Sequence, residues 1–372
     1  MIAALSMGVE EEYLVVDAVS RRPQFVGAAM VRALSDVDFH REFSTAQAEF
    51  ASPVCTDLAS LGQELDRGRR VLAGAARDHG ALLITTGTPP LGRPGPPPVT
   101  GKQRYQLMAA EYGALAEDQG VCGCHVHVGV PDADHAVQVS NHIRPWLPAL
   151  LALGANSPFF DGRDTGHASW RTTVWSRWPV CGVPPRFHSA AHYDDLVGRL
   201  VDAGVIADAG MVYYYVRPSQ HVPTVEVRVA DVATTVEEAL LQAALTRALV
   251  GTALVFTPRE SPPDAIIRAA CARAAMVGLE GRCLDAVTGR ACTGWDLVDR
   301  LVSHVHDALR DVGDLGFVEH RLAWLRRHGG GATRQRLVLR EGGDLRAVVD
   351  HLSVTSSGWQ WPTTLPHGTE GH

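Results

Sequence analysis

Apolar and polar residues alternate along four stretches of the chain, and this period of two predicts strands with one buried and one open face. The first stretch runs from Leu5 to Asp17, and in it Glu10 and Glu12 point to the same side. Like charges side by side repel each other, so we expect a cation over them, with a divalent metal ion as the leading candidate. A solvated acidic strand edge is the alternative at this point. The opposite face carries Val9, Glu11, Tyr13 and Val15.

A second stretch, from Phe43 to Pro53, places Glu49 on one face with Gln47 and Ala51, and Pro53 is expected to end it. The third stretch, Val121 to Val130, has a regular apolar back. Its front carries Gly123, His125, His127 and Gly129. One histidine alone would more often be a core residue, but two on one glycine-flanked face favour a ligand role. The cysteines of this stretch point to the apolar side and do not predict a zinc site.

The fourth stretch runs from Thr224 to Asp231, and its alternation puts Glu226, Arg228 and Ala230 on one face. Val225, Val227, Val229 and Asp231 take the other face. A surface ion pair between Glu226 and Arg228, stabilising by less than about 1 kcal/mol, is the alternative to a functional role. Four strands with an apolar back and a polar front predict an antiparallel sheet that opens onto a polar cavity.

Between and after these strands the apolar period changes to that of amphipathic helices. The Gly- and Pro-rich run 89–100 predicts a mobile surface loop after a buried strand at 81–88. We therefore expect an α+β fold, with residues 1–357 as a single domain and 358–372 as a disordered tail. The predicted helices span 27–34, 57–78, 102–119, 133–153, 192–204, 235–254, 262–276, 295–312, 318–327 and 342–354.

The segment from Asn156 to Pro179 is loop-like and carries three arginines, Arg163, Arg171 and Arg177, among three tryptophans. Tryptophans here suggest the wall of a pocket, and arginines suit carboxylates or phosphates. A long loop folded over the core is the alternative.

Composition narrows the function further. The chain has 372 residues, a formal net charge of −7, seven cysteines and a single lysine, Lys102. The negative charge without a basic tract argues against nucleic-acid or membrane partners. An odd, scattered set of cysteines and an N-terminus unlike a signal peptide predict a cytoplasmic protein. The surroundings of Lys102 lack the glycine spacing of a P-loop, so bound phosphates would be held by arginine and metal.

Taken together, these motifs resemble the type 2 glutamate–cysteine ligase family of carboxylate-amine ligases. The resemblance runs from about residue 5 to 355, with the motifs in the family's order. It rests on Gly8-Val-Glu-Glu-Glu12, Glu49 before Phe50-Ala-Ser-Pro53, Cys122-Gly-Cys-His-Val-His-Val-Gly129, the 156–179 segment, Arg217-Pro-Ser and Glu226-Val-Arg228. It implies a fold like the glutamine synthetase catalytic domain, in which a curved antiparallel sheet forms an open funnel with helices packed outside.

The resemblance also implies an ADP-forming ligation of glutamate to cysteine, even if a weak one, with ATP and Mg²⁺ or Mn²⁺ as cofactors. Glu10, Glu12, Glu49 and Glu226 match metal-holding carboxylates, with His125 beside them. Arg228 matches an arginine that reaches the transferring phosphoryl group. His127 and Arg217, with the arginines of the 156–179 segment, are candidates for binding substrate or ATP. Small amino acids and amines are the expected partners, and we allow for a homodimer.

The chain departs from the family pattern in two places, at Tyr214-Tyr215 and at Ala272-Arg273, where members often carry Trp-Asp and Trp-Arg. Both departures bear on substrate identity more than on ATP binding. Two rival functions stay open from the sequence. One is a zinc-dependent hydrolase that uses His125 and His127, and the other is a non-catalytic, nucleotide-binding relative.

Overall fold

The structure is a computed structural model that describes residues 5–92, 95–117, 120–256, 261–354 and 359–361. At its centre lies a seven-stranded sheet in which neighbouring strands run antiparallel, in the order β10-β11-β5-β1-β3-β2, with β4 also paired to β1. The strands are β1 (Met7–Asp17), β2 (Phe39–Arg41), β3 (Gln47–Ala51), β4 (Ala81–Ile84), β5 (Gly123–Gly129), β10 (Val216–Pro218) and β11 (Thr224–Asp231).

Three two-stranded sheets and a set of helices complete the described chain. The small sheets are β6 (Phe159–Phe160) with β7 (Arg163–Asp164), β8 (Cys181–Gly182) with β9 (Tyr213–Tyr214), and β12 (Arg282–Leu284) with β13 (Ala291–Thr293). The helices are α1 (Gly27–Leu34), α2 (Leu58–Asp78), α3 (Gln103–Tyr112), α4 (Ala114–Glu117), α5 (Ala133–Ile143), α6 (Leu147–Gly154), α7 (Trp170–Trp175), α8 (Ala190–Asp202), α9 (Val236–Val255), α10 (Asp264–Val277), α11 (Gly294–Asp311), α12 (Leu315–His328), α13 (Gly331–Arg340) and α14 (Leu345–Leu352), with 3-10 turns at Arg144–Trp146 and Ala209–Met211.

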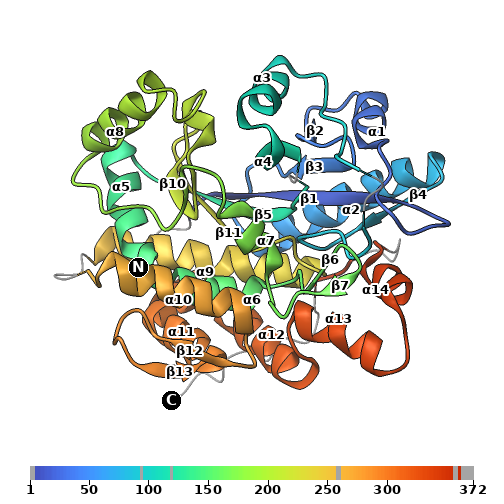
Figure 1. The fold of residues 1–372 in the computed structure, drawn as a ribbon. Helices are drawn as coiled ribbons and strands as arrows, with labels where there is room; N and C mark the ends of the chain where they lie inside the picture. The colour runs from blue at the N-terminus through green and yellow to red at the C-terminus, as the bar shows by residue number, and fades with distance from the viewer. Residues whose placement is uncertain (1–4, 93–94, 118–119, 257–260, 355–358, 362–372) are drawn as a thin grey trace.

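The helices divide between the two sides of the sheet. In Figure 1, α9, α10 and α11 lie below the central strands, whereas α3, α4 and α8 stand above them. Helix α9 packs against β5 and against α2, α5 and α11. It is the one helix of the described ranges long and apolar enough to cross a membrane, but 78% of its apolar window is buried, as in a core helix. These features confirm the predicted α+β class with an antiparallel sheet.

A buried ion pair fixes β1 from its apolar side. Arg69 of α2 donates to both carboxylate oxygens of Glu11, over 2.5 and 3.0 Å, and Tyr13 Oη donates to the same carboxylate. Arg69 also donates to the carbonyls of Ala233 and Thr234, just after β11. Charge-assisted bonds in a buried setting hold a precise geometry. This network therefore holds together β1, α2 and the end of β11, which position the acidic front of the sheet.

One strand prediction is wrong at its end. A β-bulge lies between Val227 and Ala230, after which Ala230 pairs with Cys124 and Asp231 pairs with Gly123. Because directly paired residues share a face, the bulge exchanges the expected sides of Ala230 and Asp231. The side chain of Asp231 thereby joins the polar front.

The helix predictions hold with some changes. The stretch expected to be one helix over 133–153 is divided into α5, a 3-10 turn and α6, because Pro145 and Pro148 cannot donate backbone hydrogen bonds. Strand β4 ends at Ile84, since Thr85 N–H donates instead to Leu352 O over 3.0 Å. Helix α13 was not predicted, because its start lies in a glycine run. The last two residues of predicted helix 102–119 lie outside the described residues.

Part of the segment expected to be disordered is described. Trp359 packs against Gly62 of α2 and its backbone N–H donates to Asp66 over 3.1 Å. The Trp361 ring stacks on Phe317 with centroids 5.4 Å apart. The remainder, 362–372, and residue 358 lie outside the described residues.

Candidate active site

The register of three neighbouring strands brings the predicted acidic and histidine residues together on the open face of the sheet. Glu10 on β1 is paired with His125 on β5, and His127 on β5 is paired with Glu226 on β11. Directly opposed residues lie within side-chain reach. Two further pairs extend the row to both sides, Glu12 with Glu49 and Arg217 with Glu226.

Glu10, His127 and Glu226 form one half of this row, which we call the Glu226 group. Each offers a ligand atom, and these atoms lie within 4.8 Å of one another. His127 Nε2 is 3.3 Å from Glu10 Oε1 and 3.9 Å from Glu226 Oε1, and it is buried with no hydrogen-bond partner. Arg217 Nε donates to Glu226 over 2.7 Å, and Arg228 donates to its other oxygen. The negative charge of this group is therefore already balanced in part by protein cations.

The electrostatics of the Glu226 group follow from these neighbours. Burial would raise the pKa of Glu226, but the charges of the two arginines outweigh it and hold this pKa well below the usual range. Burial would also raise the pKa of Glu10, but the close approach of His125 and His127 lowers it well below the usual range. The pKa of His127 is raised, because the close approach of the Glu10 carboxylate and the charges of Glu226 and Glu10 outweigh the effect of its burial.

His125 stands between the two halves of the row. Its Nδ1 is 3.4 Å from Glu10 Oε2, and its Nε2 is 4.0 Å from Glu12 Oε1 and 3.5 Å from Arg171 Nη2. Burial, followed by the charge of Arg228, lowers the pKa of His125 to about 3. The imidazole is accordingly neutral at physiological pH and keeps a lone pair.

Glu12, Glu42 and Glu49 form the other half, which we call the Glu49 group. The backbone N–H of Gly123 donates to Glu12 over 2.6 Å. Burial and the charge of Glu42 raise the pKa of Glu12 to about 8, although two arginines oppose the shift. Burial, and then the charges of Glu42 and Glu10 and the close approach of the Glu42 carboxylate, raise the pKa of Glu49. These carboxylates repel one another, because in the described residues none of them forms an ion pair with an arginine or a lysine. Sequence reasoning missed Glu42, since it lies just before the alternating stretch.

A buried polar network positions Arg171 against this row. Asp231 accepts hydrogen bonds from the hydroxyls of Ser157 and Ser169, over 2.7 and 2.8 Å, and the Arg171 backbone N–H donates to Ser157 Oγ over 3.0 Å. The Arg171 guanidinium, buried, donates to the carbonyl of Arg228 over 3.3 Å. Asp231 and the two serines were also missed, because the bulge that turns Asp231 forward leaves no mark in the alternation.

The arginines of the 156–179 segment are placed very differently. Arg171 lies over the Trp175 ring, 5.2 Å from its centroid, and Arg228 lies 5.7 Å from the same centroid. Cation–π packing of this kind holds two like charges beside one surface. Arg163, by contrast, is exposed on β7, and Arg177 is exposed after α7 with its Nε donating to Val174 O. In the described contacts, neither joins the carboxylate row.

A chamber of about 130 Å³ opens beside the Glu49 group, between the sheet and α3. Arg104 of α3, at its edge, donates to both oxygens of Asp208 over 2.6 and 3.0 Å. The chamber combines acidic, basic and aromatic walls, among them Glu12, Glu42, Tyr105, Trp178, Tyr213 and Arg228.

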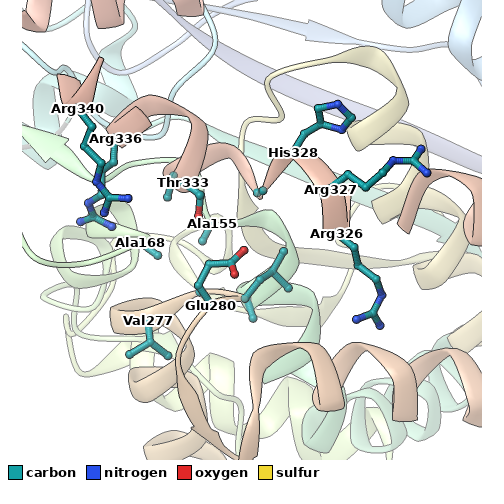
Figure 2. A pocket seen from close by; sticks show the side chains of 16 residues that line it. Ala155, Ala168, Val277, Glu280, Arg326, Arg327, His328, Thr333, Arg336 and Arg340 are labelled. Atoms are coloured by element: carbon teal, nitrogen blue, oxygen red, sulfur yellow. The ribbon is translucent and has the colours of Figure 1, made fainter. Parts of the chain in front are cut away.

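A larger cavity, about 500 Å³, lies between α10, α12 and α13 (Figure 2). Arg336 and Arg340 lie side by side at one end, Arg326 and Arg327 lie at the other, and Glu280 points into the space between. Arg336 is engaged by Asp164 over 2.7 and 2.8 Å. Among the described residues that line this cavity, none belongs to the carboxylate row, so the two sites are separate.

The fold matches solved structures of peptide-forming ligases. A bifunctional glutathione synthetase from Pasteurella multocida aligns with a TM-score of 0.69 and 16% identity, over 94% of this chain and 52% of that one. A glutamate–cysteine ligase from Francisella tularensis, solved in complex with AMP, aligns with a TM-score of 0.72 and 14% identity, over 94% and 87%. At these identities the likeness establishes the fold.

Sequence comparison is more specific. The model of the glutamate-cysteine ligase family 2 (GCS2) matches residues 6–351. The protein named "Putative glutamate–cysteine ligase 2-1" of Saccharopolyspora erythraea is 51% identical over 94% of both chains, and a similarly named protein of Salinispora arenicola is 47% identical over 95% of both. The open-faced sheet with its acidic row is thus the scaffold of a carboxylate-amine ligase. The chain belongs to glutamate–cysteine ligase family 2.

Proposed function

We propose that this ligase uses ATP to join the side-chain carboxylate of L-glutamate to the amine of L-cysteine, forming γ-glutamylcysteine, ADP and phosphate. The observation that carries the proposal is the row of carboxylates on one open sheet face. Arginines form ion pairs with Glu226 at one end, whereas among the described residues no arginine or lysine forms an ion pair with the carboxylates at the other end. Such a row suits the binding of a polyphosphate with divalent ions. The names of the family and of its relatives supply the substrates.

The residues present fit Mg²⁺, or Mn²⁺ in its place. Carboxylate oxygens are the ligands that these hard ions prefer. In the Glu226 group, the unpartnered Nε2 of His127 faces two carboxylates. In the Glu49 group, Glu42 lies near enough to raise the pKa values of both Glu12 and Glu49, and among the described residues none of the three forms an ion pair with an arginine or a lysine. We assign one ion to Glu10, Glu226 and the neighbouring histidines. A second ion would be held by Glu12, Glu42 and Glu49.

When bound, the ions neutralise the ATP phosphates and favour transfer of the γ-phosphoryl group to the glutamate carboxylate. Arg228 is fixed by Glu226 on one side and by Trp175 on the other, so its guanidinium is held at the row without large motion. A preorganised cation of this kind stabilises charge that develops on the transferring group. The cysteine amine then attacks the acyl carbon of the mixed anhydride, and phosphate leaves.

The 130 Å³ chamber next to Glu12 and Arg228 is the proposed place of the amino-acid substrates. It is smaller than the 300–1,000 Å³ or so that is typical of sites for drug-sized ligands, which favours small amino acids over a macromolecular acceptor. Arg104, now paired with Asp208, is the cation at the chamber edge that could receive an α-carboxylate. No role in catalysis is proposed for the exposed Arg163 and Arg177.

The rival functions have less support. A zinc hydrolase would use His125 and His127, yet these histidines stand among five carboxylates of one row, a set that favours harder ions. A non-catalytic relative would be expected to lose part of the acidic row, and all of its members are present.

The test is release of ADP by the purified full chain with Mg²⁺ and ATP, screened over pairs of amino acids and amines. We expect release that needs both glutamate and cysteine, with γ-glutamylcysteine identified by mass spectrometry. If ADP is released only with a different pair of amino acid and amine, that pair replaces glutamate and cysteine as the proposed substrates. If no pair releases ADP and the protein holds stoichiometric zinc, the proposed ligase chemistry is wrong.

A further inference from the structure

Two cysteines face each other across the small hairpin β12–β13, remote from the carboxylate row. Cys283 and Cys292 are direct register partners. On either side of them, Asp285 N–H donates to Arg290 O over 2.9 Å and Gly294 N–H donates to Gly281 O over 3.1 Å. Because hydrogen-bonded and non-hydrogen-bonded pairs alternate along an antiparallel ladder, the two cysteines occupy a hydrogen-bonded pair.

The Cα spacing of this position lies within the range of protein disulfides, because the Cα atoms of a hydrogen-bonded antiparallel pair are about 5.5 Å apart. The Cβ atoms of such a pair lie up to about 5.5 Å apart and must approach to about 3.5–4.5 Å for the bond to form. The hairpin therefore has to twist locally, and strain of this kind makes a disulfide easier to reduce. Both side chains lie on the inner face of the hairpin, since their strand neighbours Arg282, Ala291 and Thr293 are exposed. Burial, and then the neighbouring Cys292, raise the pKa of Cys283 to about 11, which fits two thiols held close together.

The two thiols differ in access. Cys283 is buried, with its Sγ 3.7 Å from the carbonyl of Gly278 at the end of α10, whereas Cys292 is partly exposed. All seven cysteines lie in the described residues, and no other two of them are paired in a strand register. Cys181 is the other partly exposed thiol, and it provides a matched control.

We infer that Cys283 and Cys292 form a reversible disulfide by exchange with a small disulfide such as cystine. The thiolate of Cys292, the accessible residue, attacks one sulfur of the small disulfide, whose S–S bond breaks as a small thiolate leaves. Cys283 then gives up its proton and attacks Cys292 Sγ, expelling the second small thiolate. The protein loses two electrons and two protons, and the small disulfide becomes two thiols.

The hairpin lies on the side of the molecule opposite α3 and α8, beneath α10 and α11 (Figure 1). The bond can therefore form while the open face of the sheet stays accessible. This inference does not depend on the proposed function, because its readout is a covalent link and not turnover.

The sequence provides a direct assay. Trypsin cleaves after Arg282, Arg290 and Arg300 and so separates Cys283 from Cys292, leaving peptides 283–290 and 291–300. The folded full chain is incubated with cystine, blocked with a maleimide, digested without reductant and analysed by mass spectrometry. We expect a linked species with the summed mass of the two peptides less two hydrogens, at least about tenfold more abundant than the cysteinylated Cys292 peptide. Dithiothreitol should return the two separate peptides.

Two variants sharpen the result. Cys181→Ser should leave the linked species unchanged, and Cys292→Ser should abolish it and leave Cys283 unmodified, because the buried thiol then lacks an accessible partner. A stable mixed disulfide on Cys292 without the linked species would overturn the inference. So would maleimide on both cysteines after cystine treatment, or a link from either of them to a different cysteine.

Discussion

The Glu226 group and the Glu49 group lie on the same face of the sheet, but their buried carboxylates are stabilised in different ways. In the Glu226 group, Arg217 and Arg228 form ion pairs with Glu226. His127, whose pKa is raised, lies 3.3 Å from Glu10, so the protein itself balances part of the negative charge. In the Glu49 group, burial and then the repulsion among carboxylates raise the pKa values of Glu12 and Glu49, although Arg171 and Arg228 oppose the shift at Glu12.

This difference indicates which half depends on bound cations. Burying a carboxylate is costly unless it is paired or coordinates a metal. The Glu226 group is assembled in the free protein and can orient Arg228 before substrates arrive. The Glu49 group reaches its stable charge state either by binding protons or by binding a cation, so ligands and pH should act on it most strongly.

The largest expected effect on ADP release comes from a substitution in the Glu226 group. Glu226→Gln keeps the shape of the side chain but removes the charge that holds two arginines and faces His127. We expect ADP release to fall by about a thousandfold or more, as when a central electrostatic group of a site is removed. Circular dichroism provides the control for folding. A folded variant with turnover within tenfold of the parent would remove Glu226 from the site.

A substitution in the other half should act on metal affinity first. Glu42→Gln removes one of three crowded carboxylates, and we expect the Mg²⁺ concentration for half-maximal ADP release to rise about 10–100-fold. The matched control is Glu280→Gln in the separate cavity of Figure 2, which should leave the Mg²⁺ dependence unchanged. An unaltered Mg²⁺ dependence in the Glu42 variant would exclude it from the ion site.

The planar fork of Arg228 can be tested separately from its charge. Arg228→Lys retains the cation but cannot bridge Glu226 and the transferring group in the same way, so we expect turnover to fall about tenfold or more. Arg163→Lys is the control, since Arg163 is exposed on β7, and its turnover should stay unchanged. Equal turnover in both variants would show that Arg228 only forms a structural ion pair with Glu226 and does not contact the transferring phosphoryl group.

The smallest expected effect is on stability against pH. The folded-state pKa of Glu12 is raised to about 8 from an ordinary value of 4.5, so the folded protein binds a proton more tightly than the unfolded chain. Its contribution is present below the unfolded pKa and is lost as pH rises through the folded pKa, with a magnitude of at most a few kcal/mol. Without metal, the melting temperature should therefore fall between pH 5 and 8. Saturating Mg²⁺ and ATP should flatten this slope, and a metal-free slope of the opposite sign would contradict the comparison.

Much of this site could be predicted from the sequence, because strand alternation is a local property. The period of two placed Glu10 and Glu12 on one face and His125 and His127 on another, and antiparallel pairing then brought these faces into one row. The start of the predicted helix 57–78 was also accessible, because its first residue, Asp57, caps α2 by accepting a hydrogen bond from Ser60 N–H.

The rest depends on tertiary geometry. The burial of Arg171 and the exposure of Arg163 and Arg177 follow from where the 156–179 segment crosses the sheet, which similar local sequences do not distinguish. Glu42 joins the row only through the pairing of β2 with β3, and Asp231 only through a bulge. The pair of Glu11 with Arg69 connects β1 to α2 across 58 positions of the sequence.

The acyl-phosphate route itself is tested most directly by isotope transfer. A carboxylate is a poor acyl donor until one of its oxygens leaves as phosphate, and a row that binds divalent ions at the ATP phosphates suits phosphoryl transfer to that carboxylate. Glutamate labelled with oxygen-18 in its side-chain carboxylate is incubated with cysteine, ATP, Mg²⁺ and the full chain. We predict that one labelled oxygen appears in the released inorganic phosphate for each ADP formed. Label in AMP, with pyrophosphate among the products, would contradict the mechanism and the roles given to Glu10, Glu12, Glu49, Glu226 and Arg228.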